Sequence, residues 1–216
     1  MDIQTVRKKA GREEIDYPFL LSMLEGYTRP RDKISDWLES GDLIRIKKGI
    51  YVFGERIAQT PFSHEILANL IYGPSAISLG YALSLHGLIP ERVTTITSIT
   101  PKRNKSFATP AGTFTYRYLE LKKYPVGIEW MPLGETGHFL MAGPEKALCD
   151  LICLTSGDSI SMSHHGMHDW LIHDQRLYEE GLHSLRVGRI KEIATIYQDA
   201  RIDLLALFLK KFRRKK

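Results

Sequence analysis

The chain has 216 residues, 43% of them hydrophobic and 25% charged, and its formal net charge at pH 7 is +5. This composition is that of an ordinary globular protein and excludes a largely disordered one, and the length suits one large or two small domains. No short apolar stretch follows a basic start at the amino terminus, so we expect no secretory signal and a cytoplasmic protein.

The first segment of the chain predicts three short helices followed by a β-hairpin. The first helix covers residues 2–10, and Asp16 is the expected N-cap of the second. Pro30 suits the first turn of the third helix, which we expect to end at Gly41. Its apolar residues recur at helical spacing, so one face of this helix is expected to be buried.

Residues 41–54 have the pattern of a tight hairpin. Apolar and basic residues alternate over 43–47, a Lys-Gly pair forms the turn, and 50–53 are apolar. This pattern fits both an ordinary surface hairpin and the wing of a DNA-binding module. Because helices joined by a short turn precede it, we favour the wing and predict a winged helix-turn-helix domain over residues 1–56.

The remainder of the chain, residues 57–216, predicts a mixed α/β domain with a helical carboxyl terminus. We expect 55–63 to be a linker and Thr60-Pro61 to open a helix running to about Tyr72. Further helices are expected over 75–86, 143–154, 168–178 and 188–212, and strands over 92–100, 112–121 and 127–133. The whole chain is therefore predicted to be of the α+β class.

One uncharged stretch, residues 66–90, is long enough to be tested as a membrane span. Gly73-Pro74 interrupts it near the middle, and polar residues recur within it. We therefore expect two buried helices here and no membrane association.

Charge is unevenly distributed along the chain. Residues 1–56 hold 11 basic and 10 acidic side chains, whereas 92–125 hold 7 basic and 1 acidic. Residues 126–185 are acidic, with 2 basic and 9 acidic side chains, and 186–216 return to 10 basic and 3 acidic. Basic blocks separated by an acidic one indicate an anionic partner, although the last block also fits a solubilising tail.

Candidate DNA contacts lie at the start of the third helix and on the hairpin. The outward face of that helix carries Asp32, Asp36 and Glu39, which are unfavourable beside phosphates, so we expect little reading of the major groove by its body. The candidate DNA-binding residues of this domain are Arg29, Arg31, Lys33, Ser35, Arg45, Lys47 and Lys48. The alternative is that these are solvated side chains on a protein-interaction module.

A basic loop in the second domain carries three further candidates for DNA binding, Lys102, Arg103 and Lys105. With other basic side chains they are candidates for one surface that holds a nucleic-acid backbone or an acidic protein; these others are Arg92, Arg117, Lys122 and Lys123. An exposed basic loop without a partner is the other interpretation.

Four histidines between residues 164 and 173 raise the question of a metal site. His164 and His168 have the i, i+4 spacing of a helical metal pair, but Gly166 lies between them and no third ligand is evident from spacing. We therefore predict no metal site and no cofactor. Cys149 and Cys153 also lie at helical spacing, and we expect them to be reduced and packed in the core.

Enzyme signatures are otherwise missing from the sequence. The chain has no GxGxxG fingerprint, no Walker A lysine motif and no GxSxG nucleophile elbow. It also lacks a Gly-Ser pair followed closely by two spaced acids, the arrangement with which a nucleotidyltransferase would hold metal ions. We therefore expect a protein that is not an enzyme.

Three segments carry residues in the order of one family's motifs. The hairpin segment supplies Leu38, Gly41, Leu43, Arg45, Gly49 and Tyr51. The next supplies Ser78, Ala82, Leu83, His86, Gly87 and Leu88, and the third supplies Pro144, Glu145, Ala147, Leu148, Asp150 and Leu151. In these residues the chain resembles the AbiEi-type antitoxins, the transcriptional-regulator component of type IV toxin–antitoxin (abortive infection) systems. The resemblance covers most of residues 30–155; further on, Asp174-Gln175-Arg176 stands where the family has Asp-Leu-Arg.

The resemblance implies a DNA-binding antitoxin that represses its own promoter. Its winged helix would bind repeats in the promoter DNA, which we expect to be inverted. Its second domain would counter a nucleotidyltransferase toxin, with or without direct contact between the two proteins. Two alternatives remain open from the residues: a winged-helix module whose second domain binds a protein without any DNA role, and a metal-dependent nuclease that uses His164 and His168.

Overall fold

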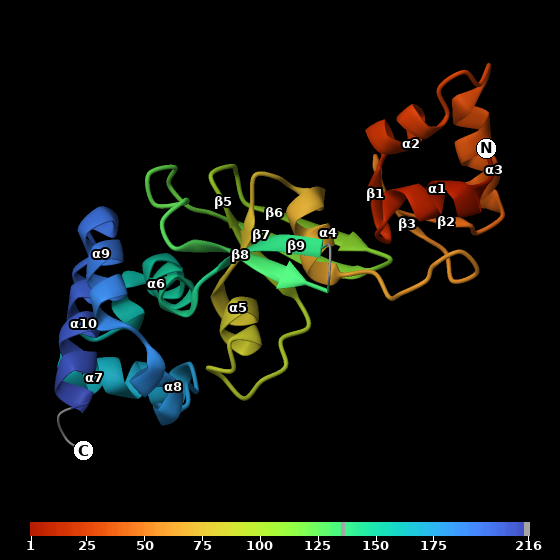
Figure 1. Ribbon diagram of the computed structural model, residues 1–216. Helices are drawn as coiled ribbons and strands as arrows, with labels where there is room; N and C mark the ends of the chain where they lie inside the picture. Colours follow the sequence, from red (N-terminus) through yellow and green to blue (C-terminus); the bar gives the residue numbers. More distant parts are fainter. Residues whose placement is uncertain (135–136, 214–216) are drawn as a thin grey trace.

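A computed structural model describes residues 1–134 and 137–213 and has mixed α and β structure. The chain is elongated: a small amino-terminal unit lies at one end, a β-sheet lies in the middle, and helices α9 (Val187–Tyr197) and α10 (Ala200–Phe212) lie at the far end (Figure 1). The last three residues of the basic block at 186–216 fall outside the described part of the chain.

The amino-terminal unit has three helices and a three-stranded antiparallel sheet of order β1-β3-β2. In chain order its elements are α1 (Ile3–Ala10), β1 (Glu14–Asp16), α2 (Tyr17–Met23), α3 (Pro30–Glu39), β2 (Leu43–Lys47) and β3 (Ile50–Phe53). The three predicted helices and the hairpin are confirmed, whereas strand β1 was not predicted.

Local signals explain where these elements begin and turn. The carboxylates of Asp2 and Asp16 accept hydrogen bonds from the backbone of Thr5 and Phe19, which caps α1 and α2. Gly49 has φ +86°, a left-handed conformation that costs glycine little, and it closes the β2–β3 turn.

The second unit contains a six-stranded sheet of order β6-β7-β5-β4-β9-β8. Its strands are β4 (Ala76–Ile77), β5 (Ile96–Thr100), β6 (Lys105–Thr109), β7 (Gly112–Tyr118), β8 (Ile128–Leu133) and β9 (Gly137–Ala142). Strands β5 and β7 are parallel, as are β4 and β9, and the other pairs are antiparallel. Helix α4 (His64–Ile71) packs against β4, β5 and β9, and α5 (Leu79–Leu85) packs against β5.

Helices make up the rest of this unit, as predicted for the carboxyl terminus. Helix α6 (Pro144–Leu154) packs against α5 and α9. It is followed by the 3-10 turn η1 (Gly157–Ser159), helix α7 (His164–Asp169), the π-helix η2 (Trp170–Asp174) and helix α8 (Glu179–Ser184). In the described residues no helix combines the length and apolar character needed to cross a membrane.

Three expectations for the second unit are wrong. Helix α4 does not begin at Thr60-Pro61 but at His64, because the hydroxyl of Ser63 accepts hydrogen bonds from Glu65 N and Ile66 N and so supplies the N-cap. The stretch 75–86 is not one helix, since it begins with strand β4. Lys105 does not lie in a loop but on strand β6, which pairs with β7.

Two hydrophobic clusters fill the molecule. The smaller one belongs to the amino-terminal unit and includes Ile34 and Trp37, the predicted inward face of α3. The larger one fills the second unit, but it also contains Ile46 of β2 and Val52 of β3. The hairpin therefore packs its side chains into both clusters, and one of its faces is covered by the second unit.

Candidate nucleic-acid interface

The first turn of α3 presents basic side chains to solvent. Arg29 and Arg31 are exposed, and Arg29 forms an exposed ion pair of 3.7 Å with Asp32. Arg31 donates a 3.3 Å hydrogen bond to Tyr17 Oη, and the Lys33 ammonium lies 5.6 Å from the centroid of the Trp37 ring. These contacts orient all three side chains, and the exposed charges of Arg29 and Arg31 remain available to an anion.

The outward face of α3 is acidic, as the sequence predicts. Ser35 is exposed on this helix, together with Asp32, Asp36 and Glu39. Carboxylates repel a phosphate backbone, so a duplex is better accommodated at the start of the helix than along its body.

The hairpin presents two exposed basic side chains, Arg45 and Lys48. The Arg45 guanidinium lies 5.9 Å from the centroid of the Tyr51 ring, a cation–π arrangement that holds it against the sheet. Lys48 lies beside Gly49 at the tip of the turn. Both charges face solvent, as a backbone contact requires.

Lys47 is placed differently from its neighbour, because it reaches the second unit. Its Nζ donates a 2.6 Å hydrogen bond to the carbonyl of Ile71 and lies 4.4 Å from the centroid of the Phe107 ring. Burial lowers the pKa of Lys47, and the nearby charges of Lys105 and Lys102 lower it further. Lys47 therefore joins the two units, a role that its place in the sequence did not indicate.

Lys102 and Lys105 lie on the same aromatic surface as Lys47. The Lys102 ammonium donates to the carbonyl of Gly73 and lies 5.5 Å from the centroid of the Tyr72 ring. That of Lys105 lies 5.6 Å from the centroid of Phe107. We call Lys47, Lys102 and Lys105 the lysine cluster. The sequence assigned its members to two different domains, and the fold brings them together.

The aromatic part of this surface was missed by sequence reasoning. The Tyr72 and Phe107 rings lie 5.8 Å apart, and each also contacts Tyr116. Lys102 and Lys105 are exposed, and in the described residues no carboxylate forms an ion pair with any member of the lysine cluster. Positive charge is concentrated here without local compensation, which favours an anionic ligand.

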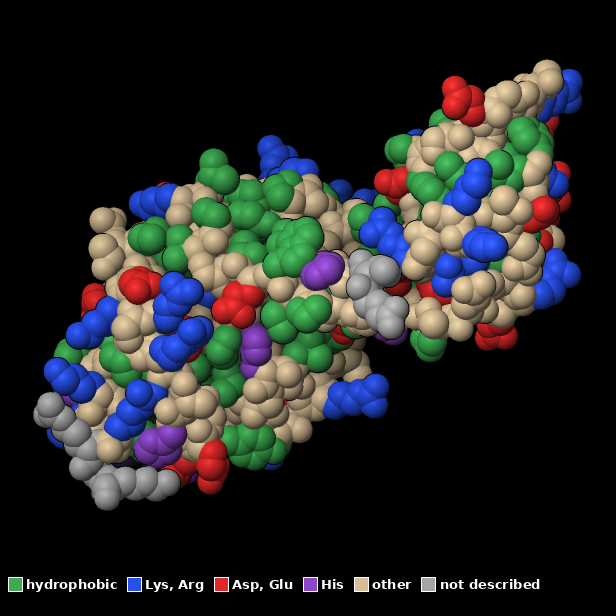
Figure 2. Space-filling model, viewed as in Figure 1, with side chains coloured by type: hydrophobic (Ala, Val, Ile, Leu, Met, Phe, Trp, Pro, Cys, Tyr) green, Lys and Arg blue, Asp and Glu red, His purple; other side chains and the backbone are tan. Residues whose placement is uncertain are grey.

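Other predicted members of the basic surface are in different surroundings. Arg103 is exposed next to Lys102, and Arg117 is exposed on β7. Lys122 and Lys123 pair instead with Glu120, at 3.2 and 3.9 Å, which offsets their charge. Figure 2 shows basic side chains on both sides of the junction between the units, interspersed with acidic ones.

The exposed bases of α3, the hairpin and the lysine cluster can hold a polyanion by its phosphates. A scan of protein-family models finds no match for the chain, and no curated protein matches it.

Proposed function

We propose that the chain is a DNA-binding antitoxin and autorepressor of a type IV toxin–antitoxin system, countering a nucleotidyltransferase toxin. The observation that carries the DNA-binding part is the lysine cluster, in which an anchor on the hairpin meets two exposed lysines of the second unit. The toxin part rests on the resemblance to AbiEi-type antitoxins in the three motif segments.

The order of elements in the amino-terminal unit supports a winged helix-turn-helix assignment for residues 1–56. Helix, strand, two helices and a hairpin, with a three-stranded antiparallel sheet, is the order in which such a module would be built. In this assignment α3 is the recognition helix and the β2–β3 hairpin is the wing.

The proposed contacts with DNA are made mainly to phosphates and less to base edges. Arg29 and Arg31 would meet the backbone at the start of α3, and Arg45 and Lys48 would meet it from the wing. Lys102, Arg103 and Lys105 would extend this track on the second unit. The DNA partner is the promoter of the protein's own operon, carrying inverted repeats, and the protein acts in the cytoplasm.

One observation favours a second candidate, a protein-interaction module without a DNA role. Side chains of the wing, Ile46 and Val52, are packed into the larger hydrophobic cluster, and α3 presents carboxylates to solvent. Both features limit how closely a duplex can approach, whereas a basic protein would fit the acidic face of α3.

An electrophoretic mobility shift over a salt titration separates the two candidates. The DNA comes from upstream of the gene itself, and the proteins are wild type, Lys48→Glu and Lys191→Glu. Lys191 is exposed on α9, so its substitution is a control with the same change in charge. We expect Lys48→Glu, but not Lys191→Glu, to lose specific binding. Because Lys48→Glu leaves Lys47 and its anchoring contacts intact, the loss would not come from a displaced hairpin.

The extended contact is tested by the triple variant Lys102→Glu, Arg103→Glu, Lys105→Glu. The slope of log K against log salt should become shallower by about 0.9 for each phosphate that the variant no longer neutralises. An unchanged slope would remove the second unit from the interface. Absence of specific binding by the wild type at low salt would overturn the autorepressor and favour the protein-interaction module. Rescue of cell growth upon co-expression with the neighbouring toxin tests the antitoxin role separately.

A further inference from the structure

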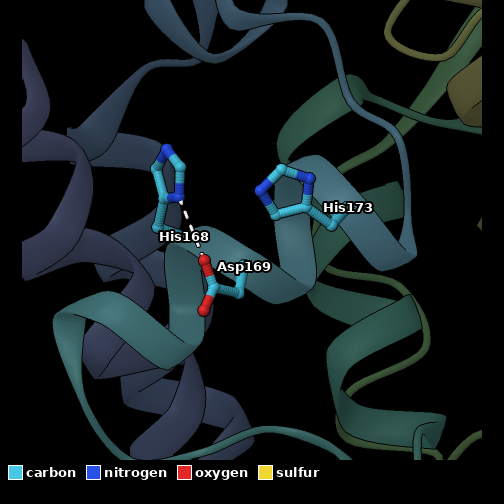
Figure 3. A group of neighbouring side chains, drawn as sticks. All are labelled: His168, Asp169 and His173. Carbon is cyan, nitrogen blue, oxygen red and sulfur yellow. Dashed lines mark hydrogen bonds and ion pairs between the residues drawn. The ribbon is translucent and has the colours of Figure 1, made fainter.

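A widened helical turn brings three metal-ligating side chains together, away from the basic surface. Helix α7 continues directly into the π-helix η2, where Gln175 N donates a 2.9 Å hydrogen bond to Trp170 O, five residues back. Within this stretch lie His168, Asp169 and His173. Their ligand atoms all lie within 4.8 Å of one another (Figure 3).

The π-turn explains why His173 can join the other two. In a regular α-helix, with 3.6 residues per turn, residues five apart point about 140° away from each other. The wider turn of a π-helix reduces this angle, and such turns occur frequently at functional sites. The imidazole centroids of His168 and His173 accordingly lie 6.1 Å apart, with the rings nearly perpendicular.

We propose that His168, Asp169 and His173 bind one divalent transition-metal ion of the zinc class. Two imidazoles and one carboxylate are a common donor set for such ions, and three protein ligands leave room for a water molecule. Bonds of 2.0–2.1 Å in a tetrahedral site require donors about 3.3 Å apart. Side-chain rotation closes that gap, since Asp169 is only half-buried and His173 is exposed.

Further side chains lie against the three residues. Asp169 Oδ2 lies 3.2 Å from His165 Nε2, while Asp169 Oδ1 faces His168 Nδ1 at 3.5 Å. His165 thus lies beside the Asp169 oxygen that is not paired with His168, where it can orient the carboxylate. Phe208 and Phe212 of α10 pack against the His168 ring at 6.2 and 6.5 Å between centroids, forming an apolar wall.

The site differs from the histidine pair that spacing alone suggested. The ring of His164 packs against Phe208 at 6.3 Å between centroids, and His164 is not a member of the three-residue group. The ion would instead bridge the last turn of α7, which packs against α10, and the π-turn. Its role is to clamp this widened turn in place, and no catalytic step is assigned to it.

Titration calorimetry of the full-length, untagged protein with Zn²⁺ tests the proposal, with Co²⁺ as a spectroscopic probe. We expect one ion per chain and, with Co²⁺, a visible d–d absorption band from a low-symmetry site. His168→Ala, Asp169→Asn and His173→Ala should each weaken Zn²⁺ binding at least tenfold. His165→Ala should weaken it by about tenfold if His165 acts only through Asp169.

A matched control comes from His138→Ala, which removes an exposed histidine on β9 outside the proposed group. This variant should bind Zn²⁺ like the wild type. Zn²⁺ should also raise the melting temperature of the wild type and of His138→Ala but not that of His173→Ala, a substitution at an exposed position that leaves the fold intact. Failure to bind one equivalent, or equal binding by wild type and His173→Ala, would overturn the proposal. Neither result depends on DNA binding.

Discussion

Ser78 Oγ donates a 2.6 Å hydrogen bond to Asp150 Oδ2, linking residues 72 positions apart in the chain. The other oxygen of the same carboxylate accepts a 3.0 Å bond from Lys146 Nζ and a further bond from the hydroxyl of Tyr197. Burial raises the pKa of Asp150 and lowers that of Lys146, which disfavours the charged form of both groups. The charge of each therefore stabilises the charge of the other. Two of the three family-like segments thus meet inside the second unit, where they hold α5, α6 and α9 together.

Removing the carboxylate from this network should severely destabilise the fold. Asp150→Ala leaves the buried Lys146 ammonium without its partner, which typically costs about 3–5 kcal/mol. Equilibrium urea unfolding measures this loss. Asp158→Ala, at an exposed position, is the control and should stay within about 0.5 kcal/mol of wild type. A similarly small effect of Asp150→Ala would contradict the role given to the pair.

Substitution of the two adjacent lysines of the hairpin should affect stability to different extents. Lys47→Met keeps an apolar side chain but leaves the carbonyl of Ile71 without its charged donor, and we expect a loss of about 1.5–3 kcal/mol in unfolding free energy. Lys48→Met should leave stability unchanged within about 0.5 kcal/mol because Lys48 is exposed. Equal stabilities of the two variants in urea would show that Lys47 does not anchor the hairpin.

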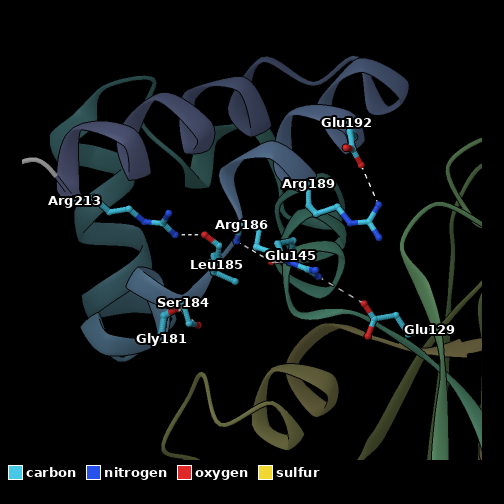
Figure 4. Close-up of polar contacts among 9 residues, drawn as sticks. All are labelled: Glu129, Glu145, Gly181, Ser184, Leu185, Arg186, Arg189, Glu192 and Arg213. Carbon is cyan, nitrogen blue, oxygen red and sulfur yellow. Dashed lines mark hydrogen bonds and ion pairs between the residues drawn. The ribbon is translucent and has the colours of Figure 1, made fainter.

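Acidification should weaken the contact between α6 and the start of α9. Glu145 accepts hydrogen bonds of 2.8 and 3.1 Å from Arg186 N and Nε (Figure 4). Burial raises the pKa of Glu145, but these hydrogen bonds outweigh burial and hold the pKa below its usual value of 4.5. Because the folded-state pKa is depressed, the stabilisation is complete above about pH 4.5 and is lost as pH falls through the folded-state value.

Melting temperatures measured between pH 7 and pH 3 test the direction of this pH dependence. The fall in melting temperature below pH 4.5 should be shallower in Glu145→Gln than in the wild type. Glu192→Gln removes an exposed carboxylate paired with Arg189 at 3.0 Å and serves as the control. An identical pH profile for wild type and Glu145→Gln would exclude Glu145 as the responsible group.

The two cysteines should differ in reactivity toward iodoacetamide. Burial raises the pKa of Cys149 well above its usual value, and the thiol is fully enclosed. Cys153 is half-buried, burial also raises its pKa, and its Sγ lies 3.8 Å from Lys123 Nζ. Mass spectrometry should therefore detect slow alkylation of Cys153 in the native protein and alkylation of Cys149 only in denaturant. Faster labelling of Cys149 in the native state would disprove this order.

Elements governed by neighbouring residues were predictable from the sequence. The aspartate caps of α1 and α2 and the glycine turn of the hairpin act within a few residues, so they can be recognised in the sequence alone. Strands β1, β4, β6 and β9 were missed; β6 and β9 have five and six residues, whereas β1 and β4 have only three and two. Strands this short are set by distant partners, such as Ile99 opposite Ala76, and not by their own pattern.

The candidate sites, too, were only partly predictable: the sequence shows which residue types are present, and the fold decides which of them meet. Composition identified Lys102 and Lys105 as candidates, but only the fold brings Lys47 of the hairpin to the Phe107 ring, which Lys105 also contacts. Histidine spacing drew attention to His164 and His168 but led to the prediction of no metal site, whereas the fold brings His168, Asp169 and His173 together. No periodicity in the sequence indicates the π-helix over Trp170–Asp174.

The hairpin β2–β3 has a consequence for how the chain unfolds, because it belongs to both hydrophobic clusters. Leu43 and Phe53 pack into the smaller cluster, whereas Ile46 and Val52 pack into the larger one. If either cluster opens, hairpin side chains move away from the other cluster and expose its apolar residues to water. We therefore expect the stability of each unit to depend in part on the other.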